Sequence, residues 1–123
     1  MKVLALDYGS ARTGVAVSDP TGTIARPLGV VERAGTDRGL ARLRALIAEE
    51  GPDRVVVGLP LTLRGEHGEQ AQETERFVET LRAAIGCPVD LFDERFTSVL
   101  AGGDDARAAA HLLTSYLEWS RDR

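Results

Sequence analysis

The opening stretch MKVLALDYGSARTGVAVSD (1–19) decides the fold. It contains two short apolar runs, VLAL (3–6) and GVAVS (14–18), whose length and composition are typical of β-strands. Only the polar, glycine-containing segment GSART (9–13) separates them, which predicts a hairpin. A third run, LGVVE (28–32), follows Pro27 and extends the hairpin to an antiparallel meander of three strands.

The rest of the chain alternates helices and strands. Apolar residues recur at helical spacing over 40–47, ending at Gly51 and Pro52, over 77–85, ending at Gly86, and from 105 to the C-terminus. Strands are predicted at RVVVGL (54–59), which shows little alternation and therefore indicates burial on both faces, and at 89–92. This order predicts an α/β fold: a mixed five-stranded sheet of three antiparallel meander strands and then two parallel ones, with helices on both faces.

The bulk composition sets limits on the class of protein. A chain of 123 residues with 43% hydrophobic residues suits one folded domain. Its net charge of −4 argues against a broad basic surface that would hold nucleic acid by charge alone. The single Cys87 cannot form an internal disulfide, and the apolar run before Asp7 is too short for a signal peptide or membrane span. We therefore expect a cytoplasmic protein that does not associate with membranes.

Carboxylates follow two of the predicted strands. Asp7 lies directly after the first strand, and Gly9 beside it would let the backbone approach a phosphate or a metal closely. Asp93 and Glu94 follow the last strand, and ligands in such sheets bind beyond the carboxyl ends of parallel strands. The alternative is structural: Asp7 caps a turn, and Asp93 caps a helix.

A third pair of acids, Asp104 and Asp105, begins the last predicted helix. Acids at a helix N-terminus are also expected from the helix dipole alone, so this placement suits either a capping role or a metal ligand. Carboxylates from three segments would form an oxygen-rich site of the kind that Mg²⁺ or Mn²⁺ prefers. Such ions support hydrolysis of phosphodiesters. His67, in a polar loop, and His111, within the last predicted helix, could each relay a proton, but histidines at such positions are common without a catalytic role, and that interpretation is favoured.

Taken together, five motifs resemble the YqgF/RuvX family: ALDYGSARTGVAVSD (5–19), RPL (26–28), VVVGLPLTLRG (55–65), DERFTS (93–98) and DARAAAHLLTSYLE (105–118). The resemblance spans nearly the whole chain. It implies a single ribonuclease H-like nuclease domain over 1–123, acting in pre-16S rRNA processing or, alternatively, as a Holliday junction resolvase.

The resemblance also implies roles for individual residues. Asp7, Glu94 and Asp105 match the acids of the family's metal site, and Gly9 and Gly14 match its opening loop. Positions that match plausible phosphate contacts are Arg12, Arg26, Arg64 and Arg95, for each of which a surface salt bridge is an equal alternative. The segment between Ser98 and Asp105 is shorter than the family's, which leaves Asp104 as a substitute for Asp105.

Three other functions are compatible with these residues. A resolvase would work as a dimer on branched DNA, whereas we expect a monomer or weak homodimer. The Asp-x-Gly opening also resembles the phosphate loop of actin-like ATPases, but those enzymes bind nucleotide between two domains. A nucleic-acid binding module without catalysis would keep the fold and lose metal-dependent cleavage.

Overall fold

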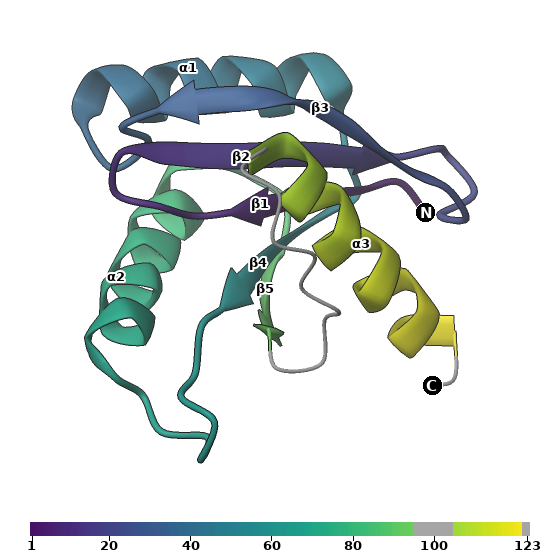
Figure 1. Ribbon diagram of the computed structural model, residues 1–123. Helices are drawn as coiled ribbons and strands as arrows, with labels where there is room; N and C mark the ends of the chain where they lie inside the picture. Colours follow the sequence, from purple (N-terminus) through teal and green to yellow (C-terminus); the bar gives the residue numbers. More distant parts are fainter. Residues whose placement is uncertain (95–104, 122–123) are drawn as a thin grey trace.

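The computed structural model describes residues 1–94 and 105–121, which form a five-stranded mixed sheet with three helices (Figure 1). The strand order is β3-β2-β1-β4-β5. The elements in chain order are β1 (Val3–Asp7), β2 (Arg12–Ser18), β3 (Ala25–Glu32), α1 (Asp37–Glu50), β4 (Arg54–Leu59), α2 (Glu69–Ala84), β5 (Val89–Asp93) and α3 (Asp105–Arg121). The predicted fold class and element order are confirmed.

Strand β1 lies at the centre of the sheet. It pairs with β2 in antiparallel fashion, with Leu6 opposite Val15, and with β4 in parallel, with Leu6 opposite Val57. Strand β5 then pairs with β4 in parallel, with Leu59 opposite Asp93. The carboxyl ends of β1, β4 and β5 therefore meet at one edge of the sheet.

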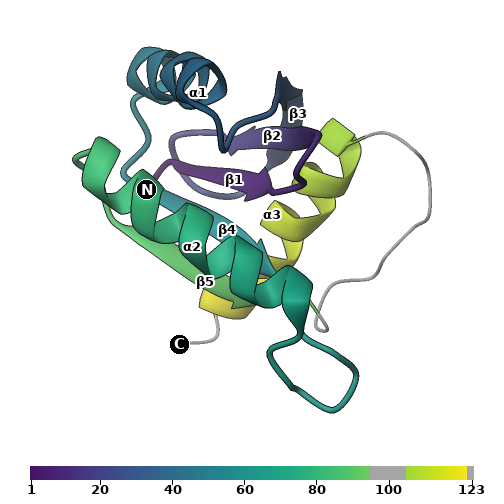
Figure 2. The same cartoon turned by 90° about the vertical axis from the view of Figure 1, so that its left-hand side faces the viewer.

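Both faces of the sheet are covered, because successive residues of a strand point to opposite sides. Leu4 and Leu6 pack on the face that α1 and α2 cover, and Val3 and Ala5 pack on the face that α3 covers. Figure 2 shows α1 and α2 on one side of the sheet and α3 on the other. All three valines of β4 are fully buried, so the prediction that this strand is covered on both faces is confirmed.

Helix α1 has the boundaries that its sequence signals indicate. Thr36 caps its start by accepting a hydrogen bond from the Gly39 amide at 3.2 Å, which satisfies one of the exposed N–H groups of the first turn. Gly51 ends it in the left-handed conformation with φ 60°, which costs glycine little. Within the described residues, no helix is long and apolar enough to cross a membrane.

Strand β3 starts earlier than predicted. Pro27 predicts a break, with the strand beginning at Leu28, but in the structure the strand begins at Ala25 and includes the proline. Proline is tolerated there because β3 is the edge strand of the described sheet, and the β2–β3 register shifts between Val15 and Ala16, next to the pair formed by Ala16 and Pro27.

Candidate active site

Asp7 and Glu94 meet at the carboxyl edge of the sheet. Asp7 ends β1, Glu94 directly follows β5, and a hydrogen bond joins their side chains across the end of β4. Gly58 of β4 leaves the space for this contact, since a Cβ atom built on it would lie 2.3 Å from Oε1 of Glu94. Gly58 is not among the predicted site residues, although a glycine inside a strand often marks a close approach by another group.

Burial and neighbouring negative charges shift the pKa values of the two carboxyl groups. Burial, followed by the negative charge of Asp7, raises the pKa of Glu94 to about 7. Burial also raises the pKa of Asp7, partly opposed by its hydrogen bond with Glu94 and reinforced by the charge of Asp105. Because both pKa values are raised, this pair binds a proton more readily than separate exposed carboxyl groups do, and a bound cation would replace that proton favourably.

Asp105 reaches the same edge from the other face. A Cβ atom on Gly14 would lie 1.8 Å from the carbonyl oxygen of Asp105, so this glycine lets the first residue of α3 sit directly on β2. Its carboxylate forms an ion pair with Arg12, with 3.0 Å between Oδ2 and Nε. Within residues 1–94 and 105–121, no three Asp, Glu, His or Cys side chains are close enough to hold a metal ion. The structure thus joins two of the predicted ligands and places the third nearby, held by Arg12.

A hollow of about 160 Å³ opens beside the pair of acids. Besides Asp7 and Glu94, its lining includes Tyr8 and, from the start of α2, Gln70, Glu73 and Thr74. Tyr8 stacks on Phe77 of the same helix, with ring centroids 4.2 Å apart. The prediction of α2 rests on its apolar residues alone, yet Glu73 lies four positions before Phe77, and that spacing places both on the same helix face.

The other predicted site residues are spread more widely. Gly9 lines the hollow, and a Cβ atom on it would lie 2.6 Å from the carbonyl oxygen of Arg12, so the turn itself requires glycine. Arg64 is exposed in the connection between β4 and α2. Arg95 and Asp104 lie outside the described residues. Arg26 pairs with Val17 near the amino end of β1 and lies 3.9 Å from Glu50, so the structure does not bring it to the acids.

A profile-based family model described as Holliday junction resolvase, RuvX, matches residues 1–104. The chain belongs to the RuvX family. The family prediction is confirmed, and with it the enzyme class, a nuclease that hydrolyses phosphodiester bonds. The matched residues include Asp7 and Glu94 and stop just before Asp105.

Individual relatives of this RuvX chain are provisionally named pre-16S rRNA nucleases. One from Chloroflexus aggregans is 52% identical over 99 residues, which cover 80% of this chain and 70% of the relative. One from Chloroflexus aurantiacus has the same identity, and there the match covers 65% of the relative. One from Syntrophomonas wolfei is 36% identical, with 96% of this chain and 94% of the relative covered.

Solved structures resemble this RuvX chain in fold. Thermus thermophilus RuvC in complex with a Holliday junction substrate superposes with a TM-score of 0.68, covering 99% of this chain and 96% of that one at 18% identity. The fowlpox virus Holliday junction resolvase superposes with a TM-score of 0.59, covering 97% and 99% at 14% identity. The ribonuclease H-like fold that the sequence resemblance implied is confirmed.

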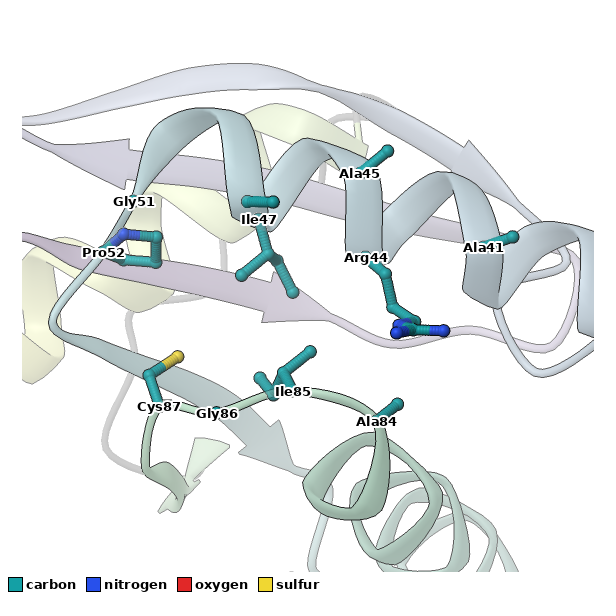
Figure 3. A pocket seen from close by; sticks show the side chains of 11 residues that line it. Ala41, Arg44, Ala45, Ile47, Gly51, Pro52, Ala84, Ile85, Gly86 and Cys87 are labelled. Carbon is teal, nitrogen blue, oxygen red and sulfur yellow. The ribbon is translucent and has the colours of Figure 1, made fainter.

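A larger hollow of about 540 Å³ lies at the opposite end of the sheet from the acids, between the ends of α1 and α2 (Figure 3). Its lining is mostly alanine, glycine and isoleucine, with Arg44 at its rim and the thiol of Cys87 beside it. The two hollows differ in chemistry: the carboxylates line the smaller one, and the larger one is apolar.

The raised pKa of Glu94 predicts an unusual pH dependence of stability for the metal-free protein. Because burial and the charge of Asp7 raise the pKa of Glu94 from an ordinary value of 4.5 to about 7 in the folded protein, the folded state binds more protons between those two pH values. This stabilising contribution is complete below about pH 4.5 and disappears as the pH rises through about 7. We expect the melting temperature of the wild type, relative to that of Glu94→Gln, to fall between pH 5 and pH 8 in EDTA. A difference that stays constant with pH would contradict the raised pKa of Glu94.

The charge of Glu73 should affect the affinity for nucleic acid. Its carboxylate adds negative charge to the hollow where a phosphate backbone would lie, so Glu73→Gln should tighten metal-free binding of an RNA hairpin by about two- to threefold at low salt. Fluorescence anisotropy in EDTA measures this affinity. Glu79→Gln is the matched control, because Glu79 lies on the same helix but pairs with Arg82 and is 72% exposed. Equal gains for both variants would mean that only the overall charge matters.

Proposed function

We propose that this chain is a divalent-metal-dependent nuclease that cuts structured nucleic acid, with trimming of the 5′ end of pre-16S rRNA as its cellular role. The observation that carries this proposal is the contact between two carboxyl side chains, Asp7 and Glu94, where β1 and β5 end at the carboxyl edge of the sheet. The names of the relatives from two Chloroflexus species and from Syntrophomonas wolfei support the choice of substrate.

The donor set fits Mg²⁺ or Mn²⁺. Both ions prefer oxygen ligands, and the described part of the chain offers carboxylates at this edge. Of the softer ligands, Cys87 lies at the far end of the sheet, and His67 is hydrogen-bonded to Glu75. Asp7 and Glu94 would hold the ion, and Asp105 would complete the site. When bound, such an ion activates water and stabilises the leaving oxygen of a phosphodiester.

The chain's own residues then have separate tasks. Glu94 would release its proton to solvent when the ion binds, so that both carboxylates become available as ligands. Tyr8, which stacks on Phe77, would form one wall of the hollow against a bound nucleotide. The guanidinium groups of Arg12 and Arg64 would bind phosphates of the backbone.

Resolution of Holliday junctions is the second candidate. The description of the matching family model favours it. So does the close fit in fold to a RuvC that was solved with junction DNA. A resolvase would need two copies placed symmetrically on the junction. We propose a cytoplasmic monomer or weak homodimer with one domain over 1–123.

Cleavage assays on three substrates test these functions. The wild type is incubated in Mn²⁺ or in EDTA with a hairpin RNA that carries a single-stranded 5′ extension, a plain RNA duplex, and a four-way DNA junction. We expect Mn²⁺-dependent cuts in the extended hairpin RNA. Symmetric cuts in the junction alone would favour the resolvase. If no substrate is cleaved, the remaining candidate is a nucleic-acid binding module without catalysis.

A further inference from the structure

The ion pair between Arg12 and Asp105 occupies one of the proposed metal ligands. Nε of Arg12 lies 3.0 Å from Oδ2 of Asp105. The backbone of Asp105 lies in close contact with Gly14, so the position of α3 against β2 places the Asp105 carboxylate at this edge. In the structure, that carboxylate binds Arg12. Asp105 also lies near enough to Asp7 to raise the pKa of that carboxyl group.

This ion pair is easily exchanged. The side chain of Arg12 is 65% exposed and that of Asp105 is 33% exposed, and ion pairs with so much contact with water contribute little net stability. A guanidinium group also binds a phosphate through two parallel hydrogen bonds, a geometry at least as favourable as the single contact with Asp105. A phosphate at the edge of the sheet would therefore compete for Arg12.

We propose that Arg12 moves from Asp105 to a phosphate when nucleic acid binds, which frees Asp105 to join Asp7 and Glu94 around the divalent ion. Arg12 is thus a positioning residue that couples substrate binding to assembly of the metal site. This inference rests on the proposed function. Coupling of this kind is reciprocal, so the metal should tighten nucleic-acid binding by the same factor as nucleic acid tightens metal binding.

Calorimetric titration with Mn²⁺ measures the coupling without any cleavage. The titration is done on the free protein and on the protein saturated with an RNA hairpin made wholly of phosphorothioate linkages, which resist hydrolysis. We expect the hairpin to tighten Mn²⁺ binding about fivefold in the wild type, the scale that exchange of an exposed ion pair allows. In Arg12→Gln, the free protein should already bind Mn²⁺ about two- to fivefold more tightly, and the hairpin should add less than twofold.

Two further variants separate this exchange from a simple loss of positive charge. Arg44→Gln removes the same charge at the other end of the sheet, where Arg44 lines the larger hollow, and should behave as the wild type. In an Asp105→Asn background, Arg12→Gln should leave Mn²⁺ affinity unchanged, because Arg12 then has no metal ligand to occupy. Thermal melts check that each variant is folded, as the exposure of Arg12 leads us to expect.

Several results would overturn the proposal. They are an unchanged or weaker Mn²⁺ affinity in Arg12→Gln, a fivefold coupling that persists in that variant, or an effect of Arg12→Gln that survives in the Asp105→Asn background. A wild type that binds Mn²⁺ with the expected coupling but cuts no substrate would contradict the proposed function and leave the exchange intact. A wild type that binds no Mn²⁺ would contradict both.

Discussion

Replacing Asp7 with asparagine is expected to lower the rate of Mn²⁺-dependent cleavage by at least about 100-fold, the scale seen when one charged group that stabilises a transition state is removed. Asparagine has nearly the same shape but no negative charge, so the site keeps its geometry and loses a ligand. Because the negative charge of Asp7 raises the pKa of Glu94, the variant should also lower that pKa. Single-turnover cleavage measures the loss of rate, and calorimetric Mn²⁺ titration measures the loss of metal affinity.

The stability of Asp7→Asn distinguishes a lost ligand from a lost fold. Asp7 is partly buried and its pKa is raised, so removal of its charge should leave the melting temperature at pH 8 equal to or above that of the wild type. Asp37→Asn, an exposed acid in the first turn of α1, is the control and should cleave normally. Equal activity of Asp7→Asn and the wild type would remove the basis of the proposed metal site.

Replacing Gly14 with alanine should have the largest effect on stability. The added Cβ atom would lie 1.8 Å from the carbonyl oxygen of Asp105 and 3.1 Å from the amide nitrogen of Ala106, and both are backbone atoms that cannot rotate away. Helix α3 must therefore move off β2, which also displaces Asp105. We expect a loss of about 3 kcal/mol, at the upper end for overpacking, and a melting temperature about 10 °C lower.

Gly29→Ala is the matched control for that experiment. Gly29 lies opposite Val15 on the neighbouring strand, and a Cβ atom built on it meets nothing within 4 Å. It should therefore leave the melting temperature nearly unchanged. Cleavage by Gly14→Ala below its own melting temperature should also be weakened. A Gly14→Ala variant as stable as the control would mean that α3 is not held against β2 in this way.

The sequence predicted the fold well because its signals are local. The runs at 3–6 and 54–59 have strand composition, and Gly51 ends a helical pattern, so short-range periodicity was enough. The start of β3 was wrong for a tertiary reason. Whether a strand tolerates Pro27 depends on its place at the edge of a sheet, which no local pattern reveals.

The site was predictable only in part. The rule that ligands bind at the carboxyl ends of parallel strands pointed to Asp7 and Glu94, and the structure places the two in contact. The ion pair of Asp105 with Arg12 joins segments far apart in the chain, and Glu73 enters the hollow from a helix that was judged by its apolar residues alone. Such contacts depend on how the elements pack, which local sequence patterns do not reveal.

The inclusion of Pro27 in β3 also affects how this chain can meet another copy of itself. An exposed strand edge is a template for further strands, and many proteins aggregate or dimerise by extending a sheet across such an edge. Strand β3 carries a proline, which has no N–H to donate, next to a register shift that disturbs the flat edge. Two copies that met on this side would have to associate through side chains, because β3 is a poor partner for a continuous intermolecular sheet.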